Sequence, residues 1–322
     1  MEKLKVGVIG VGYLGKFHAE KYAAMDDVEL VGVADPNTDA AAPVAEKCRT
    51  KLYADYRELL PQVQAVSIVV PTTLHHRVAV GCLEHHVDIL IEKPMTSTLT
   101  EADDLIDKAE AQGLVIQVGH LERFNPAVLA MGQHLTRPMF IESIRIHMFK
   151  NRGTDVDVVL DLMIHDIDIV LSIVDSPLRT IHTVGVPVVT PYTDIANARL
   201  IFENGCTANV TVSRISRDNI RRLRIFQPRC YIAVDYAKKE IMVIHQHQER
   251  DENGLPREEV LISSFVEQDA LEAELRDFVA NVRNRSTPMV SGREGRRALA
   301  VAFQIMAQIR EHIEAHRDLL NG

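Results

Sequence analysis

Short apolar runs rich in Val and Ile alternate with amphipathic stretches over the first 120 residues. Near-continuous apolar runs are typical of strands covered on both faces in a parallel sheet, and the stretches between them carry the helical period. The strands are expected at 4–9, 28–34, 65–70, 87–92 and 114–119, and the helices at 14–25, 38–48, 74–85 and 100–112. This regular alternation predicts a doubly wound parallel sheet with right-handed crossovers.

The pattern changes after residue 121. The elements expected there are a short helix after Asn125-Pro126, a strand near 139–149, a strong helix near 157–173 and two amphipathic helices at about 267–284 and 291–318. Between 179 and 246, short apolar runs separated by turn residues are typical of an antiparallel meander. The polar segment Gln248–Glu258 is expected to form a loop.

The length and this change of pattern predict two domains. The chain has 322 residues, and a domain usually takes roughly 100–200. We expect an N-terminal α/β domain of residues 1–121, followed by an α+β domain of residues 122–322 with a large, mostly antiparallel open sheet. The terminal helices can pack back on the first domain.

Composition and charge narrow the classes of function. The chain has 36 Lys and Arg against 45 Asp and Glu, a formal net charge of −9. Such an acidic protein is poorly suited to bind nucleic acid phosphates or a membrane surface through basic residues. No apolar run reaches the roughly 18 residues that cross a bilayer. The four scattered cysteines favour a reducing, cytoplasmic location over a disulfide framework.

A glycine motif follows the first predicted strand and opens the first predicted helix. The segment Gly10-Val11-Gly12-Tyr13-Leu14-Gly15 fits the dinucleotide-binding pattern G-x-G-x-x-G. Gly10 permits the tight turn, Gly12 lets the backbone approach a pyrophosphate, and Gly15 lets the helix pack close to the strand. The phosphates would then sit at the helix N-terminus, where N–H groups and the helix dipole favour an anion. The domain is therefore expected to be a Rossmann fold.

An acidic residue follows at the spacing that this fold uses for the ribose. Asp35 lies 20 residues after Gly15, at the end of the second predicted strand. Its carboxylate can accept hydrogen bonds from the ribose hydroxyls and would repel a 2′-phosphate, so NAD is favoured over NADP. The alternative is that the glycines and Asp35 only shape turns. The agreement of strand, glycines, helix and spaced acid argues against it.

Three further motifs complete a family resemblance. They are Pro71-Thr72-Thr73-Leu74-His75, Glu92-Lys93-Pro94 and Asp161-x-x-x-His165. With the glycine motif, the chain resembles the glucose–fructose oxidoreductase, inositol dehydrogenase and MocA family. The resemblance implies a cis Lys-Pro bond and a cofactor site to which Thr72, His75, Glu92 and Lys93 contribute, along with the glycine loop, Tyr13, Leu14 and Asp35.

Two longer stretches point to one branch of that family. Val118–Pro126 and Leu160–Asp168 look like the branch that oxidises the 3-hydroxyl of UDP-N-acetylglucosamine with NAD. The chain departs from that branch between Arg152 and Asp157, where the short Gly153-Thr154 connection replaces a longer, proline-rich loop. The alternatives left open are an inositol or free-sugar dehydrogenase and an NAD-binding regulator that does no chemistry.

Oxidation of a secondary alcohol requires a base for the hydroxyl proton and a cofactor for the hydride. Lys93 follows a parallel strand, at the sheet edge where ligands bind. The predicted helix at 157–173 is apolar almost all round, yet Asp157, Asp161, His165 and Asp168 fall within a sector of roughly 80°. We assign His165 as proton acceptor, Lys93 as its partner at the same hydroxyl, and Asp161 as the residue that orients His165. Which of Lys93 and His165 is the formal base stays open.

Arg123 and Asn125 are expected to contact the substrate together with Lys93, Asp161 and His165, because they begin the second domain. A cluster of arginines between 214 and 224 suits a diphosphate, although a solvated sheet edge or a subunit contact is the favoured explanation. The histidine pairs lack a third ligand nearby, so no metal site is expected. The broad meander predicts self-association as a homodimer or homotetramer.

Overall fold

The computed structural model describes residues 2–149, 156–250 and 252–315, and every structural statement below concerns these residues. They divide into two compact units. The first is drawn from residues 1–121 and 270–297, and the second from residues 122–269 and 298–322. The segment 150–155, which includes the predicted short connection at Gly153-Thr154, lies outside the described residues.

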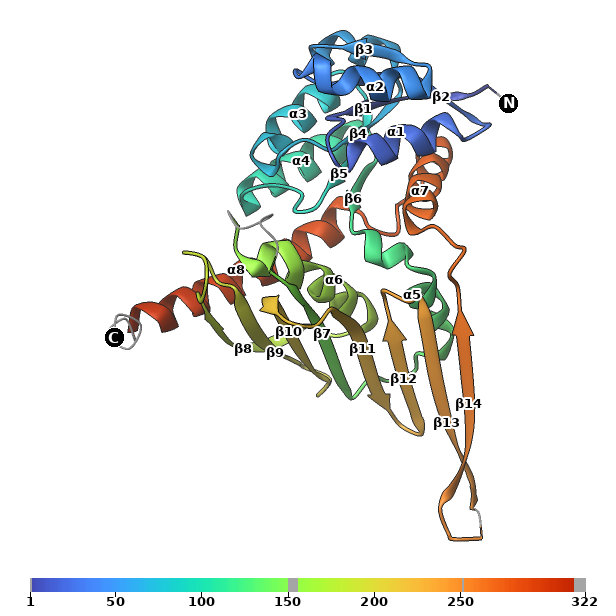
Figure 1. The fold of residues 1–322 in the computed structure, drawn as a ribbon, viewed down its shortest axis with the longest axis vertical. Helices are drawn as coiled ribbons and strands as arrows, with labels where there is room; N and C mark the ends of the chain where they lie inside the picture. Colours follow the sequence, from blue (N-terminus) through green and yellow to red (C-terminus); the bar gives the residue numbers. More distant parts are fainter. Residues whose placement is uncertain (1, 150–155, 251, 316–322) are drawn as a thin grey trace. The chain divides into compact units, whose positions relative to one another are not determined.

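The first unit is built on a six-stranded parallel sheet with strand order β3-β2-β1-β4-β5-β6 (Figure 1). Its strands are β1 (Leu4–Ile9), β2 (Val28–Ala34), β3 (Lys51–Tyr53), β4 (Ala65–Ile68), β5 (Asp88–Glu92) and β6 (Ile116–Gly119). Its helices are α1 (Gly15–Ala23), α2 (Thr38–Cys48), α3 (Thr72–Glu84), α4 (Leu99–Gln112) and α7 (Ala270–Asn284). Short 3₁₀ turns lie at Tyr56–Glu58 and Leu60–Gln62. The predicted Rossmann fold is confirmed.

Residues far apart in the sequence form the core of this unit. Strand β1 is buried almost throughout, as a strand covered on both faces should be. Leu275 and Phe278 of α7 are fully buried in the same apolar cluster as Val6 and Val8 of β1. The first unit therefore includes a helix that is encoded about 150 residues beyond its last strand.

The second unit is built on an eight-stranded sheet with strand order β14-β13-β12-β11-β7-β10-β9-β8. Only the β7–β10 pair is parallel. Its strands are β7 (Phe140–Met148), β8 (Leu178–Val186), β9 (Ile195–Phe202), β10 (Thr207–Ser216), β11 (Ile220–Gln227), β12 (Cys230–Asp235), β13 (Glu240–Arg250) and β14 (Pro256–Ser264). The predicted large, mostly antiparallel sheet is confirmed.

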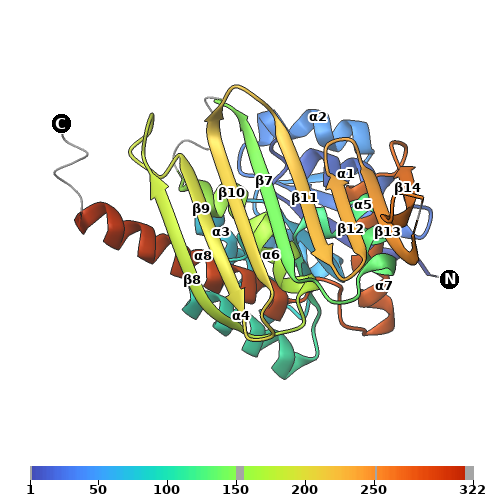
Figure 2. The ribbon, with the colours of Figure 1, turned by 90° about the horizontal axis from the view of Figure 1, so that it is seen from below.

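Helices cover one face of this sheet. They are η3 (Leu121–Phe124), α5 (Pro126–Met131), η4 (Gly132–His134), the π-helical turn η5 (Val159–Met163), α6 (Ile164–Ile173) and the part of α8 (Gly292–Ala315) that follows Arg297. Helix α5 contacts β12 and β13, whereas α6 contacts β7 and β10. Figure 2 shows the strands side by side, with α5 and α6 behind them. Burial alternates along β7, so every second side chain faces these helices and the others face away.

The structure differs from the sequence analysis in three details. The polar segment Gln248–Glu258 is not one loop, because β13 runs to Arg250 and β14 begins at Pro256. Strand β3 was not predicted, since three partly exposed residues show no period. The helix expected at 157–173 begins with a π-helical turn, which its apolar pattern does not indicate. No described helix is long and apolar enough to cross a membrane.

Candidate active site and cofactor cradle

The glycine loop at the end of β1 has the geometry of a dinucleotide cradle. Gly10 has a φ of +86°, and a Cβ on it would lie 2.6 Å from the carbonyl oxygen of Val69. A Cβ on Gly15 would lie 1.9 Å from the carbonyl oxygen of Gly10, so only glycine lets α1 start this close to the strand. A Cβ on Gly12 would meet nothing within 4 Å. The space at Gly12 therefore lies open to a ligand, at a helix start that no side chain caps.

The carboxylate of Asp35 ties this loop to the end of β2. Its two oxygens accept hydrogen bonds from the backbone N–H groups of Val11, at 3.0 Å, and Asn37, at 2.9 Å. Both bonds fix the carboxylate beside the glycine loop while its remaining lone pairs stay available. Tyr13 and Leu14 are exposed at 62% and 44%, so both side chains can be reached by a cofactor at the glycine loop.

His75 connects the ends of the neighbouring strands β4 and β5 of the first unit. Thr72 is the first residue of α3, and His75 follows one turn later, fully buried. The Nδ1 and Nε2 atoms of His75 each lie 2.9 Å from a backbone carbonyl oxygen, that of Pro94 and that of Val70 respectively. Burial lowers the pKa of His75, so the neutral ring donates to one carbonyl at a time. This residue holds the loop that carries Lys93.

The loop after β5 carries Lys93, with a cis peptide bond between Lys93 and Pro94. Glu92, the last residue of the strand, lies 3.2 Å through its Oε1 atom from Nε2 of His18 on α1. Burial alone would raise the pKa of Glu92, but the hydrogen bond and charge of His18, together with Lys93, hold it below its usual range. A partly buried negative charge on Glu92 therefore stands directly beside Lys93 in the chain.

Asp161 lies in the π-helical turn η5, and His165 lies in the first turn of α6. Both side chains are partly exposed, as is Asp157, so three of the four polar residues in the predicted sector are accessible to solvent. The fourth, Asp168, is buried, and its Oδ1 lies 3.5 Å from Nη1 of Arg123. The regular 100° spacing on which the predicted sector rests does not hold across η5.

Asp166 points toward the sheet, away from the stripe, and is held by a buried arginine. Nε of Arg145 donates to Oδ2 of Asp166 at 2.7 Å, and Ser143 donates to the same carboxylate at 2.8 Å. Nη1 of Arg145 reaches Glu122 at 3.0 Å. Arg145 thereby fixes α6 to β7 and to the segment that bears Arg123.

Asn125 has the contacts of a helix cap. Its Oδ1 accepts a hydrogen bond from the N–H of Ala127 at 3.1 Å, which caps α5. Its Nδ2 donates to the carbonyl oxygen of Tyr236 at 3.1 Å, and the residue is 5% exposed. These bonds explain why Asn125 precedes Pro126. A direct contact of Asn125 with substrate stays a prediction.

The structure places the predicted residues in two groups. The glycine loop, Asp35, Thr72, His75, Glu92 and Lys93 belong to the first unit, and Arg123, Asn125, Asp161 and His165 belong to the second. The sequence analysis missed His18 and Arg145, whose roles depend on partners distant in the chain. The only signal for His18 was a histidine one turn after Gly15. Within the described residues, no three His, Cys, Asp or Glu side chains come together as a metal site would require.

The first unit is a Rossmann fold with an open glycine loop, and the second carries Asp161 and His165 on a helix beside its sheet. This combination is typical of a nicotinamide-dependent oxidoreductase. The chain belongs to the GFO/IDH/MocA oxidoreductase family. The model of its NAD-binding Rossmann fold matches residues 4–120, and that of its C-terminal domain matches residues 141–232. The predictions of this family and of NAD as the cofactor are confirmed.

Among its relatives is the UDP-N-acetylglucosamine 3-dehydrogenase of Acidithiobacillus ferrooxidans, which is 38% identical over 317 residues, 98% of this chain and 100% of the relative. A solved structure of that enzyme covers 96% of this chain and 98% of its own with a TM-score of 0.89. The myo-inositol 2-dehydrogenase of Thermotoga maritima is 25% identical over 337 residues, 96% of this chain and 97% of the relative.

Proposed function

We propose that this protein oxidises the 3-hydroxyl of UDP-N-acetylglucosamine to a ketone with NAD. The observation that carries the proposal is the 38% identity to a UDP-N-acetylglucosamine 3-dehydrogenase over almost the whole of both chains. The segments Val118–Pro126 and Leu160–Asp168 support the same branch. Inositol dehydrogenases match at lower identity, which makes inositol the second substrate to test.

When bound, NAD supplies the acceptor for the hydride that leaves the sugar carbon. The glycine loop would hold its pyrophosphate, and Asp35 its ribose hydroxyls. His165 takes the hydroxyl proton while Lys93 donates a hydrogen bond to the same oxygen and stabilises the developing alkoxide. Asp161 orients the imidazole. The alcohol thus loses a hydride and a proton and becomes a ketone.

The assay is the absorbance of reduced nicotinamide with purified protein, NAD and one sugar at a time. We expect reduction with UDP-N-acetylglucosamine and at least tenfold lower kcat/KM with N-acetylglucosamine, glucose and myo-inositol. Reduction with myo-inositol alone would replace the proposed substrate. Tight NAD binding without reduction by any sugar would instead favour a regulator. NADP in place of NAD should give little turnover, because Asp35 repels a 2′-phosphate.

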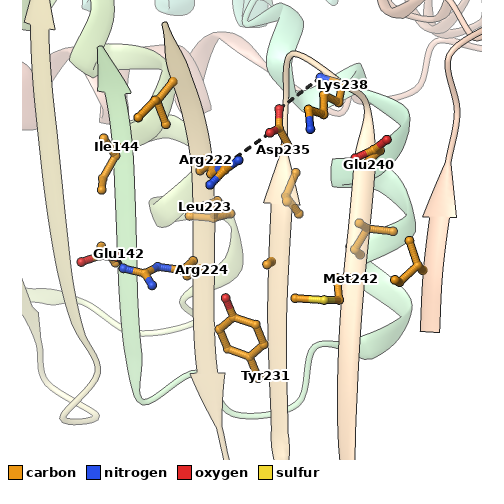
Figure 3. A pocket seen from close by; sticks show the side chains of 15 residues that line it. Glu142, Ile144, Arg222, Leu223, Arg224, Tyr231, Asp235, Lys238, Glu240 and Met242 are labelled. Atoms are coloured by element: carbon orange, nitrogen blue, oxygen red, sulfur yellow. Dashed lines mark hydrogen bonds and ion pairs between the residues drawn. The ribbon is translucent and has the colours of Figure 1, made fainter. Parts of the chain in front are cut away.

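We also propose that the protein self-associates through the sheet face that the helices leave open. This open face consists of the outward side chains of β7 and β11–β14, and it is hollowed by a pocket of about 520 Å³ (Figure 3). Arg224 pairs with Glu142, and Arg222 with Asp235 at 3.3 Å, among apolar neighbours such as Ile144 and Met242. The arginines are therefore paired across the sheet, which favours a subunit contact over a diphosphate site. The four free cysteines support a cytoplasmic location.

A further inference from the structure

Arg214 of β10 is the largest fully buried side chain of the described residues, although the sequence pattern groups it with the arginines that follow up to Arg224. Its Nε donates to Oδ1 of Asp194 at 2.9 Å. Arg214 is 1% exposed and Asp194 is fully buried. An ion pair taken out of water in this way is costly unless further hydrogen bonds satisfy both groups. The structure provides those bonds on each side.

Asp194 organises the connection between β8 and β9. Its Oδ2 accepts three backbone hydrogen bonds, from Val188 at 2.8 Å, Val189 at 2.6 Å and Thr190 at 2.9 Å. The hydroxyl of Thr190 donates to Oδ1 at 2.8 Å. Burial alone would raise the pKa of Asp194, but these backbone hydrogen bonds hold it far below its usual value. The carboxylate is therefore charged at any pH at which the protein works.

The other end of Arg214 reaches the segment that leads into η5. Its Nη2 donates to the carbonyl oxygens of Val156, at 2.7 Å, and Thr193, at 2.8 Å. Thr193 also accepts a hydrogen bond from the N–H of Val158 at 3.1 Å. Val156 and Val158 flank Asp157, whose carboxylate accepts from the N–H of Val159 at 2.9 Å and so begins the helix. One guanidinium thus connects β10, the turn before β9 and the helix start.

The segment that Arg214 holds leads into η5, whose turn is π-helical. A π-turn places one residue more in the turn than an α-helix, and such turns are rare and found often at functional sites. Asp161 lies inside this turn, and His165 lies just after it. If the segment relaxed to a regular α-helix, the residues before η5 would rotate by about 100° relative to His165, and Asp161, inside the turn, would rotate by part of that angle. The positions of Asp157 and Asp161 relative to His165 therefore depend on what holds residues 156–158.

We propose that Arg214, through its pair with Asp194, is a positioning residue of the dehydrogenase reaction: it holds the entry to η5 and so sets the position of Asp161 relative to His165. This inference rests on the proposed function, which makes His165 the proton acceptor. Arg214 itself lies in the core of the second unit and touches neither cofactor nor reacting atoms. Its effect should appear in turnover and proton transfer and not in the binding of NAD to the first unit.

The test is Arg214→Lys, which keeps a positive charge beside Asp194 but removes the planar fork that reaches two carbonyl oxygens. The matched control is Arg293→Lys, since Arg293 makes a two-bond pair with Glu110 on the surface of the first unit. For Arg214→Lys, we expect kcat to fall by at least tenfold, the pH profile of kcat to shift, and the Kd for NAD to change less than twofold. The control should match the wild type in all three.

A second readout does not require activity. Hydrogen exchange of the peptide covering 156–165 should become at least tenfold faster in Arg214→Lys, while peptides of β1 and α1 keep their wild-type rates. If Arg214→Lys does not fold, Thr190→Val removes one hydrogen bond to Asp194 and should shift both readouts in the same direction by a smaller factor. Wild-type kcat and wild-type exchange at 156–165 in a folded variant would overturn the proposal. Faster exchange in a protein that oxidises no sugar would retain the positioning and reject the proposed function.

Discussion

At the scale of single residues, a buried carboxyl group makes the stability of the fold depend on pH. Glu274 of α7 is fully buried, and neither of its carboxyl oxygens has a hydrogen-bond partner among the described residues. Burial, followed by the negative charge of Glu92, raises the pKa of Glu274 well above its ordinary value. The carboxyl group is therefore neutral in the folded protein at a pH where it would be charged in the unfolded chain.

Glu274→Gln should flatten the dependence of stability on pH. A raised folded pKa contributes stability that is complete below the unfolded pKa of roughly 4.3 and is lost as pH rises through the folded value. The wild type should accordingly lose free energy of unfolding from about pH 5 toward the alkaline range, and the amide variant should lose less. Denaturant unfolding at a series of pH values measures this. Glu272→Gln on the exposed side of the same helix is the control, and equal slopes in Glu274→Gln and wild type would reject the argument.

At the scale of elements, regular strands and helices could be predicted from the period of their apolar residues, whereas local irregularities could not. The buried strands of the first sheet and the alternating strands of the second follow periods that the sequence displays. The π-turn η5 has no such signature, because its residues are as apolar as those of an α-helix. The first residues of β14 are polar, so the sequence pattern assigned them to a loop. The roles of His18, Arg145 and Arg214 depend on partners in other elements, which no local pattern reveals.

The role of the helix with His165 in turnover should be separable from cofactor binding. Lys93→Ala and His165→Ala should each lower kcat with UDP-N-acetylglucosamine by about 10²–10⁴-fold, because each removes a group from proton transfer. The Kd for NAD, measured by calorimetry, should stay within about threefold for His165→Ala. Lys47→Ala and His85→Ala, on the surface of the first unit, serve as controls. Near-normal turnover in both active-site variants would remove them from the mechanism.

At the scale of the whole molecule, the open face of the second sheet exposes several large apolar side chains. Ile262 and Val260 of β14 are 70% and 51% exposed, and they pair in register with Met242 and Ile244 of β13. Side chains paired in register lie on the same face of a sheet, so these four extend the apolar part of the open face. Large apolar patches of this kind mark contact surfaces.

Ile262→Glu should lower the molar mass measured for the protein in solution, because it should separate the oligomer into monomers. A charge at this exposed position leaves the fold intact but must be desolvated in a contact between two copies. Light scattering coupled to size exclusion measures the mass. Leu129→Glu, on helix α5 at the opposite face, is the control and should keep the wild-type mass. A monomeric wild type at micromolar concentration would contradict self-association through this face.

The return of α7 to the first unit has a consequence for the order of synthesis. A ribosome that has released the first 269 residues has made every strand of the Rossmann sheet, yet Leu275 and Phe278, which fill the core beside β1, are still missing. Domains ordinarily mature from the N-terminus while translation proceeds. Here the nucleotide-binding half must wait, with apolar surface uncovered, until the second sheet has been translated, so nascent chains of intermediate length are the ones that most need a chaperone.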